Sequence, residues 1–79
     1  MKLEILTPKE QLYNGEVSIV SLPGTTGMFE ILKNHAPIIS TLTNGEIKVV
    51  DKEKNSMKFA IKGGLVEASN NVIWVLVET

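Results

Sequence analysis

Apolar and polar residues alternate along much of this 79-residue chain. The clearest case is residues 57–62, where apolar residues at 57, 59 and 61 alternate with Lys58, Ala60 and Lys62. A period of two places successive side chains on opposite faces of a β-strand, whereas an amphipathic helix repeats at three to four residues. No segment sustains the helical period. We therefore predict an all-β protein.

Turn-forming residues divide the alternating stretches. Pro8, the pair at 23–24, the glycines at 63–64 and the run at 69–71 all interrupt the apolar pattern. Short strands separated by turns at intervals of about 8–12 residues are typical of a sandwich or barrel. We predict one domain over residues 1–79, a single β-sandwich of about eight to ten short strands. The predicted strands cover residues 2–7, 16–22, 27–32, 37–42, 46–50, 57–62, 65–68 and 72–78.

Several local features lead to narrower expectations. The apolar phase slips between Ile19 and Val20, which indicates either a strand covered on both faces or a β-bulge. The Asn44-Gly45 pair is the strongest hairpin signal in the chain, because both residues tolerate positive φ. We interpret residues 8–15 as a loop and 24–27 as a turn between strands. Trp74 lies within the apolar run at 72–77 and is expected in the core.

Composition narrows the class of protein. The chain is 43% hydrophobic, which is enough for a packed core, and it has no cysteine, which favours a reducing compartment. Eight lysines and nine acidic residues give a net charge of −1 without any arginine or basic run, so a nucleic-acid binder is disfavoured. The N-terminus lacks a secretory signal pattern. A helical membrane span needs about 20 apolar residues, and the apolar run at 72–77 is much shorter, so we expect no direct membrane insertion.

Candidate chemistry is sparse. His35 is the only histidine, so a zinc site would need mostly carboxylate ligands, and no serine lies in a nucleophile elbow. We expect no catalytic residue, no metal and no cofactor. Two other interpretations stay open: a free-standing sandwich that binds a small ligand or sugar, and, less favoured, an enzyme. A flat apolar patch would indicate a partner-bound module, and a polar pocket would indicate a ligand binder.

Three motifs, taken in order, resemble one family. A strand begins with "GEV" at 15–17, and the run "LPGTTGMFEILKNHAPIISTLTNGEIKV" occupies 22–49. The segment "GGLVEASNNVIWVL" at 63–76 resembles the strand pair that closes that family's N-terminal domain. Together these motifs resemble the epsilon subunit of F-type ATP synthases over essentially the whole chain.

The resemblance implies a ten-stranded sandwich in the central stalk of the rotary enzyme. Such a domain binds the gamma subunit and the loops of the membrane c-ring, and it couples ion transport to ATP synthesis without catalysing any step itself. It implies a location on the cytoplasmic side of the bacterial inner membrane. The residues expected to face the c-ring are Thr26, Met28, Glu30 and His35, and those expected to face gamma are His35, Ala36, Pro37, Ile38 and Leu42.

Two departures from the family pattern matter. Many members carry an acidic residue at the position of Met28 and a glycine at that of Glu30, so we hypothesise that Glu30 supplies the negative group facing the c-ring. The family usually continues into an inhibitory C-terminal helical hairpin, whereas this sequence stops at Thr79. We expect a naturally short form without that switch.

Overall fold

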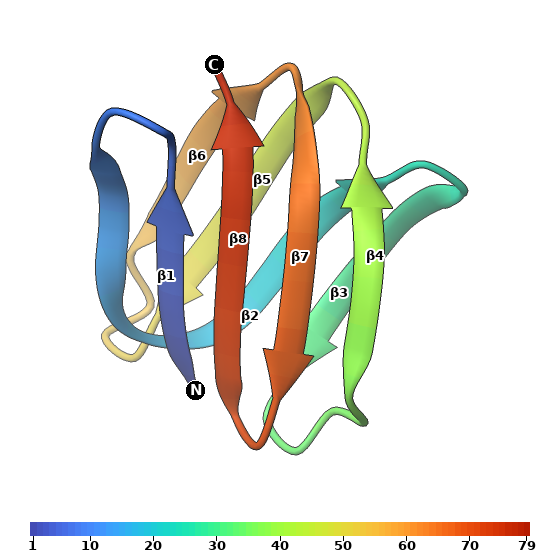
Figure 1. Ribbon diagram of the computed structural model, residues 1–79. Helices are drawn as coiled ribbons and strands as arrows, with labels where there is room; N and C mark the ends of the chain where they lie inside the picture. Colours follow the sequence, from blue (N-terminus) through green and yellow to red (C-terminus); the bar gives the residue numbers. More distant parts are fainter.

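The computed structural model describes all 79 residues and contains eight β-strands and no helix (Figure 1). This confirms the predicted all-β class. All eight predicted strands are present; the second begins five residues earlier than predicted, and the other ends shift by at most two residues. The strands are β1 (Lys2–Leu6), β2 (Gln11–Gly24), β3 (Gly27–Leu32), β4 (Ile38–Leu42), β5 (Gly45–Asp51), β6 (Ser56–Ile61), β7 (Gly63–Ser69) and β8 (Val72–Glu78).

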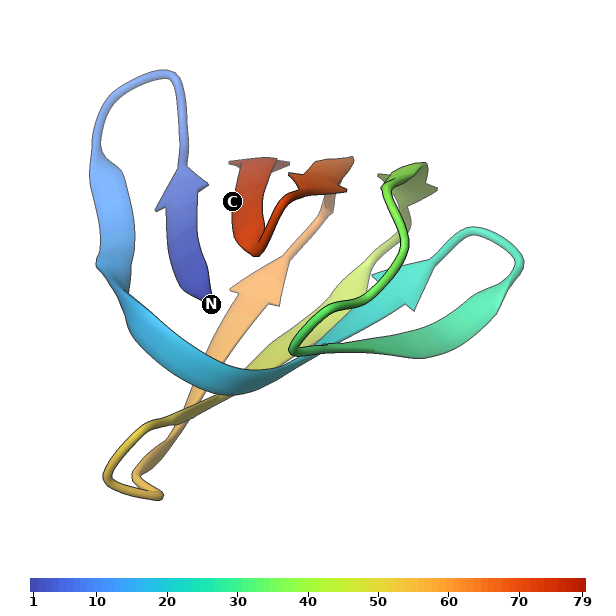
Figure 2. The same cartoon turned by 90° about the horizontal axis from the view of Figure 1, so that it is seen from below.

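The strands form two layers that face each other across the core (Figures 1 and 2). One layer contains β1, β8, β7 and β4, in that order, and the other contains β3, the C-terminal part of β2, β5 and β6. β1 and β8 run parallel, and the other pairs are antiparallel. The sandwich has eight strands rather than the ten that the resemblance implied.

β2 is a 14-residue strand that belongs to both layers. Its first part pairs with β1 from Gln11 to Glu16, and its second part pairs with β5 and β3. The loop prediction for residues 8–15 is therefore wrong beyond Glu10. The actual turn is short because the Thr7 hydroxyl accepts hydrogen bonds from the backbone N–H groups of Lys9 and Glu10, at 3.2 and 3.0 Å.

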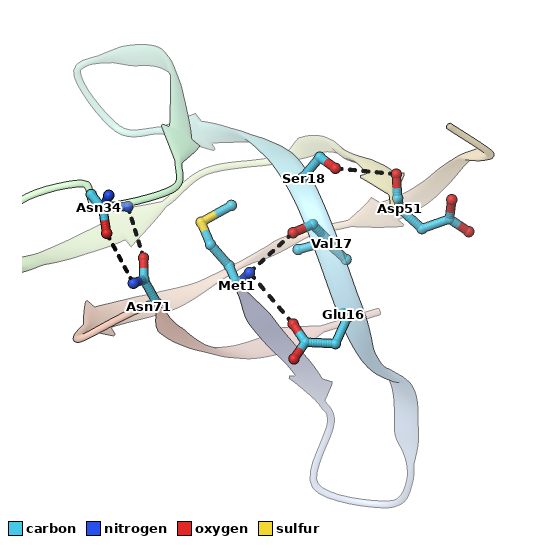
Figure 3. Close-up of polar contacts among 7 residues, drawn as sticks. All are labelled: Met1, Glu16, Val17, Ser18, Asn34, Asp51 and Asn71. Atoms are coloured by element: carbon cyan, nitrogen blue, oxygen red, sulfur yellow. Dashed lines mark hydrogen bonds and ion pairs between the residues drawn. The ribbon is translucent and has the colours of Figure 1, made fainter. Parts of the chain in front are cut away.

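The slip in apolar phase along β2 is a β-bulge. Val17 pairs with Asp51 and Ile19 with Val50, so Ser18 is the extra residue on β2. The Ser18 hydroxyl donates a hydrogen bond of 3.3 Å to the carbonyl of Asp51 (Figure 3). One extra residue reverses the side-chain alternation and bends the strand. The bulge lies where β2 passes from β1 in one layer to β5 in the other.

The Asn44-Gly45 hairpin prediction is wrong. β4 pairs with β7 and β5 pairs with β2 and β6, so residues 43–44 connect the two layers and do not close a hairpin. Gly45 is required here for space, because a Cβ at this position would lie 2.9 Å from the Cβ of Pro23. By contrast, Asn70 and Asn71 have φ of 52° and 61° and form the two-residue turn of the predicted β7–β8 hairpin.

The core contains 15 buried apolar side chains, and no buried side chain is polar or charged. Trp74 is 48% exposed, so its predicted core position is wrong. Alternation along β8 turns Ile73, Val75 and Val77 inward and Trp74 outward. The buried apolar residues are Leu3, Ile5, Val17, Val20, Leu22, Ile31, Leu42, Ile47, Val49, Ile61, Val66, Ala68, Ile73, Val75 and Val77.

Candidate partner-binding surfaces

The outward side of β3 presents three of its residues to solvent. Met28, Glu30 and Leu32 are exposed, whereas Ile31 is buried in the core. This alternation supports the premise that Met28 and Glu30 face the same way. The Ser21 hydroxyl of β2 donates a hydrogen bond of 3.2 Å to Oε2 of Glu30. The other carboxylate oxygen has no hydrogen-bond or ion-pair partner and is free to meet a cation.

The loop of residues 33–37 connects β3 in one layer to β4 in the other and is exposed throughout. The backbone N–H of His35 donates to the carbonyl of Leu32 at 3.1 Å, which closes a tight turn. Nδ1 of His35 lies 2.6 Å from the carbonyl oxygen of Ala36. No carboxylate lies within hydrogen-bonding reach of the imidazole, so the geometry offers no catalytic pair.

Two asparagines fasten this loop to the β7–β8 turn. The backbone N–H of Asn34 donates to Oδ1 of Asn71 at 2.7 Å, and Nδ2 of Asn71 donates to Oδ1 of Asn34 at 3.1 Å (Figure 3). Both residues have positive φ, 65° and 61°, a conformation that asparagine adopts more readily than most residues. Sequence reasoning identified the turn at 69–71 but not this contact, because the partners are 37 residues apart.

The residues predicted to face the c-ring do not form one cluster. Thr26 lies in the β2–β3 turn, and His35 lies beyond the opposite end of β3. A strand of six residues spans about 20 Å, so Thr26 and His35 are well separated. Met28 and Glu30 lie between them on the outward side of β3. A single contact centred on Met28 and Glu30 would include Thr26 more readily than His35.

The residues predicted to face gamma lie close together, but Ile38 is only partly exposed and packs against the core, and Leu42 is buried. Pro37, Ile38 and Ile39 line one side of a shallow hollow of about 480 Å³ beside β7. Leu42 is only 5% exposed and belongs to the core, because alternation along β4 turns it inward. Ile39, which the predicted set omitted, is 70% exposed and is the outward apolar side chain of β4. From the sequence alone, the apolar residues within 37–42 did not reveal which of them face inward.

Reactive groups are sparse in the folded chain. No group of three or more His, Cys, Asp or Glu side chains could hold a metal ion. The single ion pair joins the Met1 amino group to Glu16 at 3.4 Å (Figure 3). Burial raises the pKa of the Tyr13 hydroxyl above its ordinary value of 10.0, and the charges of Asp51 and Glu53 raise it further. No helix in the structure has the length and apolar character needed to cross a bilayer.

The two-layer sandwich thus exposes large apolar side chains, among them Met28 and Ile39, and Glu30 is exposed beside Met28. The sequence pattern of the family described as "ATP synthase, Delta/Epsilon chain, beta-sandwich domain" matches residues 1–79. The chain belongs to this family.

Relatives that carry the name ATP synthase epsilon chain resemble this chain over nearly its whole length. The Chlorobium limicola protein is 39% identical over 77 residues, which cover 98% of this chain and 88% of that one. The Chlorobaculum tepidum protein is 36% identical and is covered to 86%. A Leptospira interrogans relative is 37% identical, but the match covers only 61% of its length. The family therefore includes both short and longer chains.

Solved structures confirm the fold. A chain of the Euglena gracilis mitochondrial ATP synthase, described as OSCP/F1/c-ring, superposes with a TM-score of 0.91 at 16% identity. The match covers 98% of this chain and 49% of that one. A chain of the Tetrahymena thermophila mitochondrial ATP synthase central stalk and c-ring gives 0.82 at 18% identity and is covered to 63%.

Proposed function

We propose that this protein is a non-catalytic rotor subunit of a bacterial F-type ATP synthase, which binds the gamma subunit and the c-ring in the central stalk. The observation that carries the proposal is the family match over residues 1–79. The exposed apolar side chains of Met28 and Ile39 support it, because such side chains suit contacts with partner subunits. The proposed location is the cytoplasmic side of the inner membrane, held there through the complex.

The gamma contact is assigned to the surface formed by His35, Ala36, Pro37, Ile38 and Ile39. This surface combines an exposed loop, held by the Asn34–Asn71 hydrogen bonds, with an outward isoleucine beside a hollow. A few well-packed residues at the centre of a contact supply most of its binding energy, and a fixed loop loses little entropy on binding. Leu42 supports this surface from within the core.

The c-ring contact is assigned to the outward side of β3, with Glu30 as its charged group and Met28 as its apolar group. Met28 is 60% exposed and Glu30 is held by Ser21, so both are presented in a defined direction. An exposed ion pair contributes at most about 1 kcal/mol and is screened by salt. The Glu30 contact therefore positions the subunit on the c-ring loops more than it anchors the subunit there.

Coupling ion transport to ATP synthesis requires that the subunit transmit torque between its two partners without deforming. The 15-residue apolar core lies between two sheet layers, and a close-packed interior resists deformation. The proposed gamma and c-ring surfaces lie on β4 with its preceding loop and on β3, which neighbour each other in the chain but belong to different layers. A load applied at one surface is thus carried through the packed core to the other.

Purification of the assembled enzyme from its own membranes tests the proposal. A tagged copy of the chain should recover gamma and the c-ring together, and all three should remain associated after the catalytic subunits are removed. Glu30→Gln should reduce retention on the c-ring at low salt and weaken its salt dependence. Glu53→Gln, which removes a charge from the β5–β6 turn, should leave retention unchanged. Recovery of neither partner would overturn the assignment.

A further inference from the structure

The outer side of β1, β8 and β7 carries a second surface, which meets the hollow assigned to gamma only at Glu67. It is a shallow hollow of about 260 Å³ on the face of the sheet. Four of its lining side chains are apolar and two are acidic. We name it the Trp74 face. Its lining residues are Glu4, Leu6, Leu65, Glu67, Trp74 and Leu76.

The strand register arranges these six side chains in two parallel rows. Trp74 on β8 pairs with Glu4 on β1 and with Glu67 on β7, so the indole lies between two carboxylate residues. The next row places Leu76 between Leu6 and Leu65 in the same manner. The Trp74 face therefore consists of an acidic row with an aromatic centre beside an entirely apolar row.

The two carboxylates have no cation within the chain. The only ion pair is that of Met1 and Glu16, and neither Glu4 nor Glu67 takes part in one. Lys2 is two residues before Glu4 on the same strand, yet no ion pair within 4.0 Å joins them. Glu4 accepts one hydrogen bond, of 2.9 Å, from Nε2 of Gln11. The acidic row thus offers negative charge beside an exposed indole ring.

We propose that the Trp74 face docks a basic amphipathic helix of a partner protein, with a lysine or arginine of that helix over Trp74 and between Glu4 and Glu67. A cation near an indole face and two carboxylates is attracted by both. Leucine-like side chains of the same helix cover Leu76 and its neighbours in the apolar row. The Trp74 face adjoins the surface assigned to gamma, since Glu67 lines both hollows and pairs with Ile39, but it extends away from that surface over β8 and β1. The proposal does not rest on the proposed function, because its test requires neither gamma nor the c-ring.

The geometry favours a helix over a strand. β8 lies between β1 and β7, and β7 lies between β8 and β4, so these strands have no free edge for an added strand. A helix satisfies its own backbone hydrogen bonds and can lie across side chains alone. The two rows are two residues apart along β8, about 6.7 Å, and helical residues four apart rise about 6 Å. A cation and a leucine one turn apart therefore match the acidic and apolar rows.

Charge disfavours the other possible occupants of the Trp74 face. Two copies of this chain placed face to face would bring Glu4 and Glu67 of one copy against those of the other, and like charges oppose such a contact. An anionic membrane surface would repel the same carboxylates. A partner with positive charge beside apolar residues removes both objections.

Trp74 is the only tryptophan in the chain, so its fluorescence reports occupancy of this face directly. The probe is a synthetic helical peptide of about 18 residues, long enough to fold, with leucines on one face and an arginine at the centre of that face. Matched peptides carry glutamine or glutamate in place of the arginine. The arginine peptide should shift Trp74 emission to shorter wavelength, and the glutamine peptide should bind about three- to tenfold more weakly.

Variants of the full chain distinguish charge-dependent binding of the peptide from non-specific hydrophobic binding. Glu67→Gln and Glu4→Gln should each reduce the affinity for the arginine peptide about threefold or more, and leave the affinity for the glutamine peptide unchanged. Glu46→Gln, on the outer side of the other layer, should leave both unchanged. Equal binding of all three peptides, or no shift in emission, would overturn the proposal. So would dimerisation through this face in sedimentation, or a shift caused by anionic phosphatidylglycerol vesicles and not by the peptide.

Discussion

Two neighbouring residues of β8 offer a direct test of the inward and outward assignment. Val75 is 0% exposed in the core, whereas Leu76 is 51% exposed on the outer side of the same strand. Val75→Ala removes two methyl groups from a fully buried site. At about 0.8 kcal/mol for each group, with an added cavity term, the free energy of unfolding should fall by about 2–3 kcal/mol. Leu76→Ala, although it removes more carbon, should lower it by less than about 1 kcal/mol.

The loss at Val75 is large relative to the total stability. A domain of this length has a free energy of unfolding of about 4–12 kcal/mol. Each kcal/mol shifts the Tm of a small domain by about 4–8 °C, so Val75→Ala should lower the Tm by about 10 °C or more. Urea and thermal unfolding followed by far-UV circular dichroism measure both variants. An equal or greater loss for Leu76→Ala would refute the assignment of β8 faces and, with it, the exposure of Trp74.

Three further outcomes are expected. Gly64→Ala should strongly destabilise the fold, because the new Cβ would collide with the carbonyl oxygen of Leu76. At Gly63 a Cβ would make only an ordinary van der Waals contact, so Gly63→Ala should fold normally. Equal stability of the two variants in urea would contradict this. Asn34→Gly and Asn71→Gly keep positive φ accessible, and Asn34→Gly also keeps the backbone N–H that donates to Asn71, so a double-mutant cycle reports the side-chain hydrogen bond from Asn71 to Asn34. The coupling should be about 1 kcal/mol, and a value near zero would dismiss that side-chain bond. The pKa of Tyr13 is raised in the folded state, so the free energy of unfolding should fall as pH rises above 10.0 towards the pKa of Tyr13 in the folded protein. Tyr13→Phe should remove that part of the alkaline loss of stability in unfolding curves.

Local patterns predicted most of the strands because burial of one sheet face imposes a period of two. The bulge in β2 was visible as a phase slip at Ile19 and Val20, since an extra residue reverses the alternation. The turn at Asn70 and Asn71 was also recognisable from residue type, because positive φ is a local requirement. In each case the signal is carried by a few neighbouring residues, although the partner of the bulge, Asp51, lies 33 residues from Ser18.

Expectations that depended on distant partners were less successful. The Asn44-Gly45 pair has residues typical of a hairpin turn, but the chain passes from one layer to the other there. Glycine is needed at 45 because Pro23, from another strand, leaves no room for a Cβ. Trp74 lies within an apolar run, and only the pairing of β8 with β1 and β7 shows that the run alternates between core and outer face. The predicted contact residues depended on distant pairing in the same way, because the register of β4 on β7 turns Leu42 inward and Ile39 outward.

Co-expression of this chain with the gamma subunit of the same genome, followed by native mass spectrometry, tests the central claim most directly. The account predicts a stable complex of one chain with one gamma subunit, which Ile39→Asp should weaken and Glu46→Gln should not. A chain that runs alone at its own 8.7 kDa beside folded gamma would contradict the assignment to the central stalk.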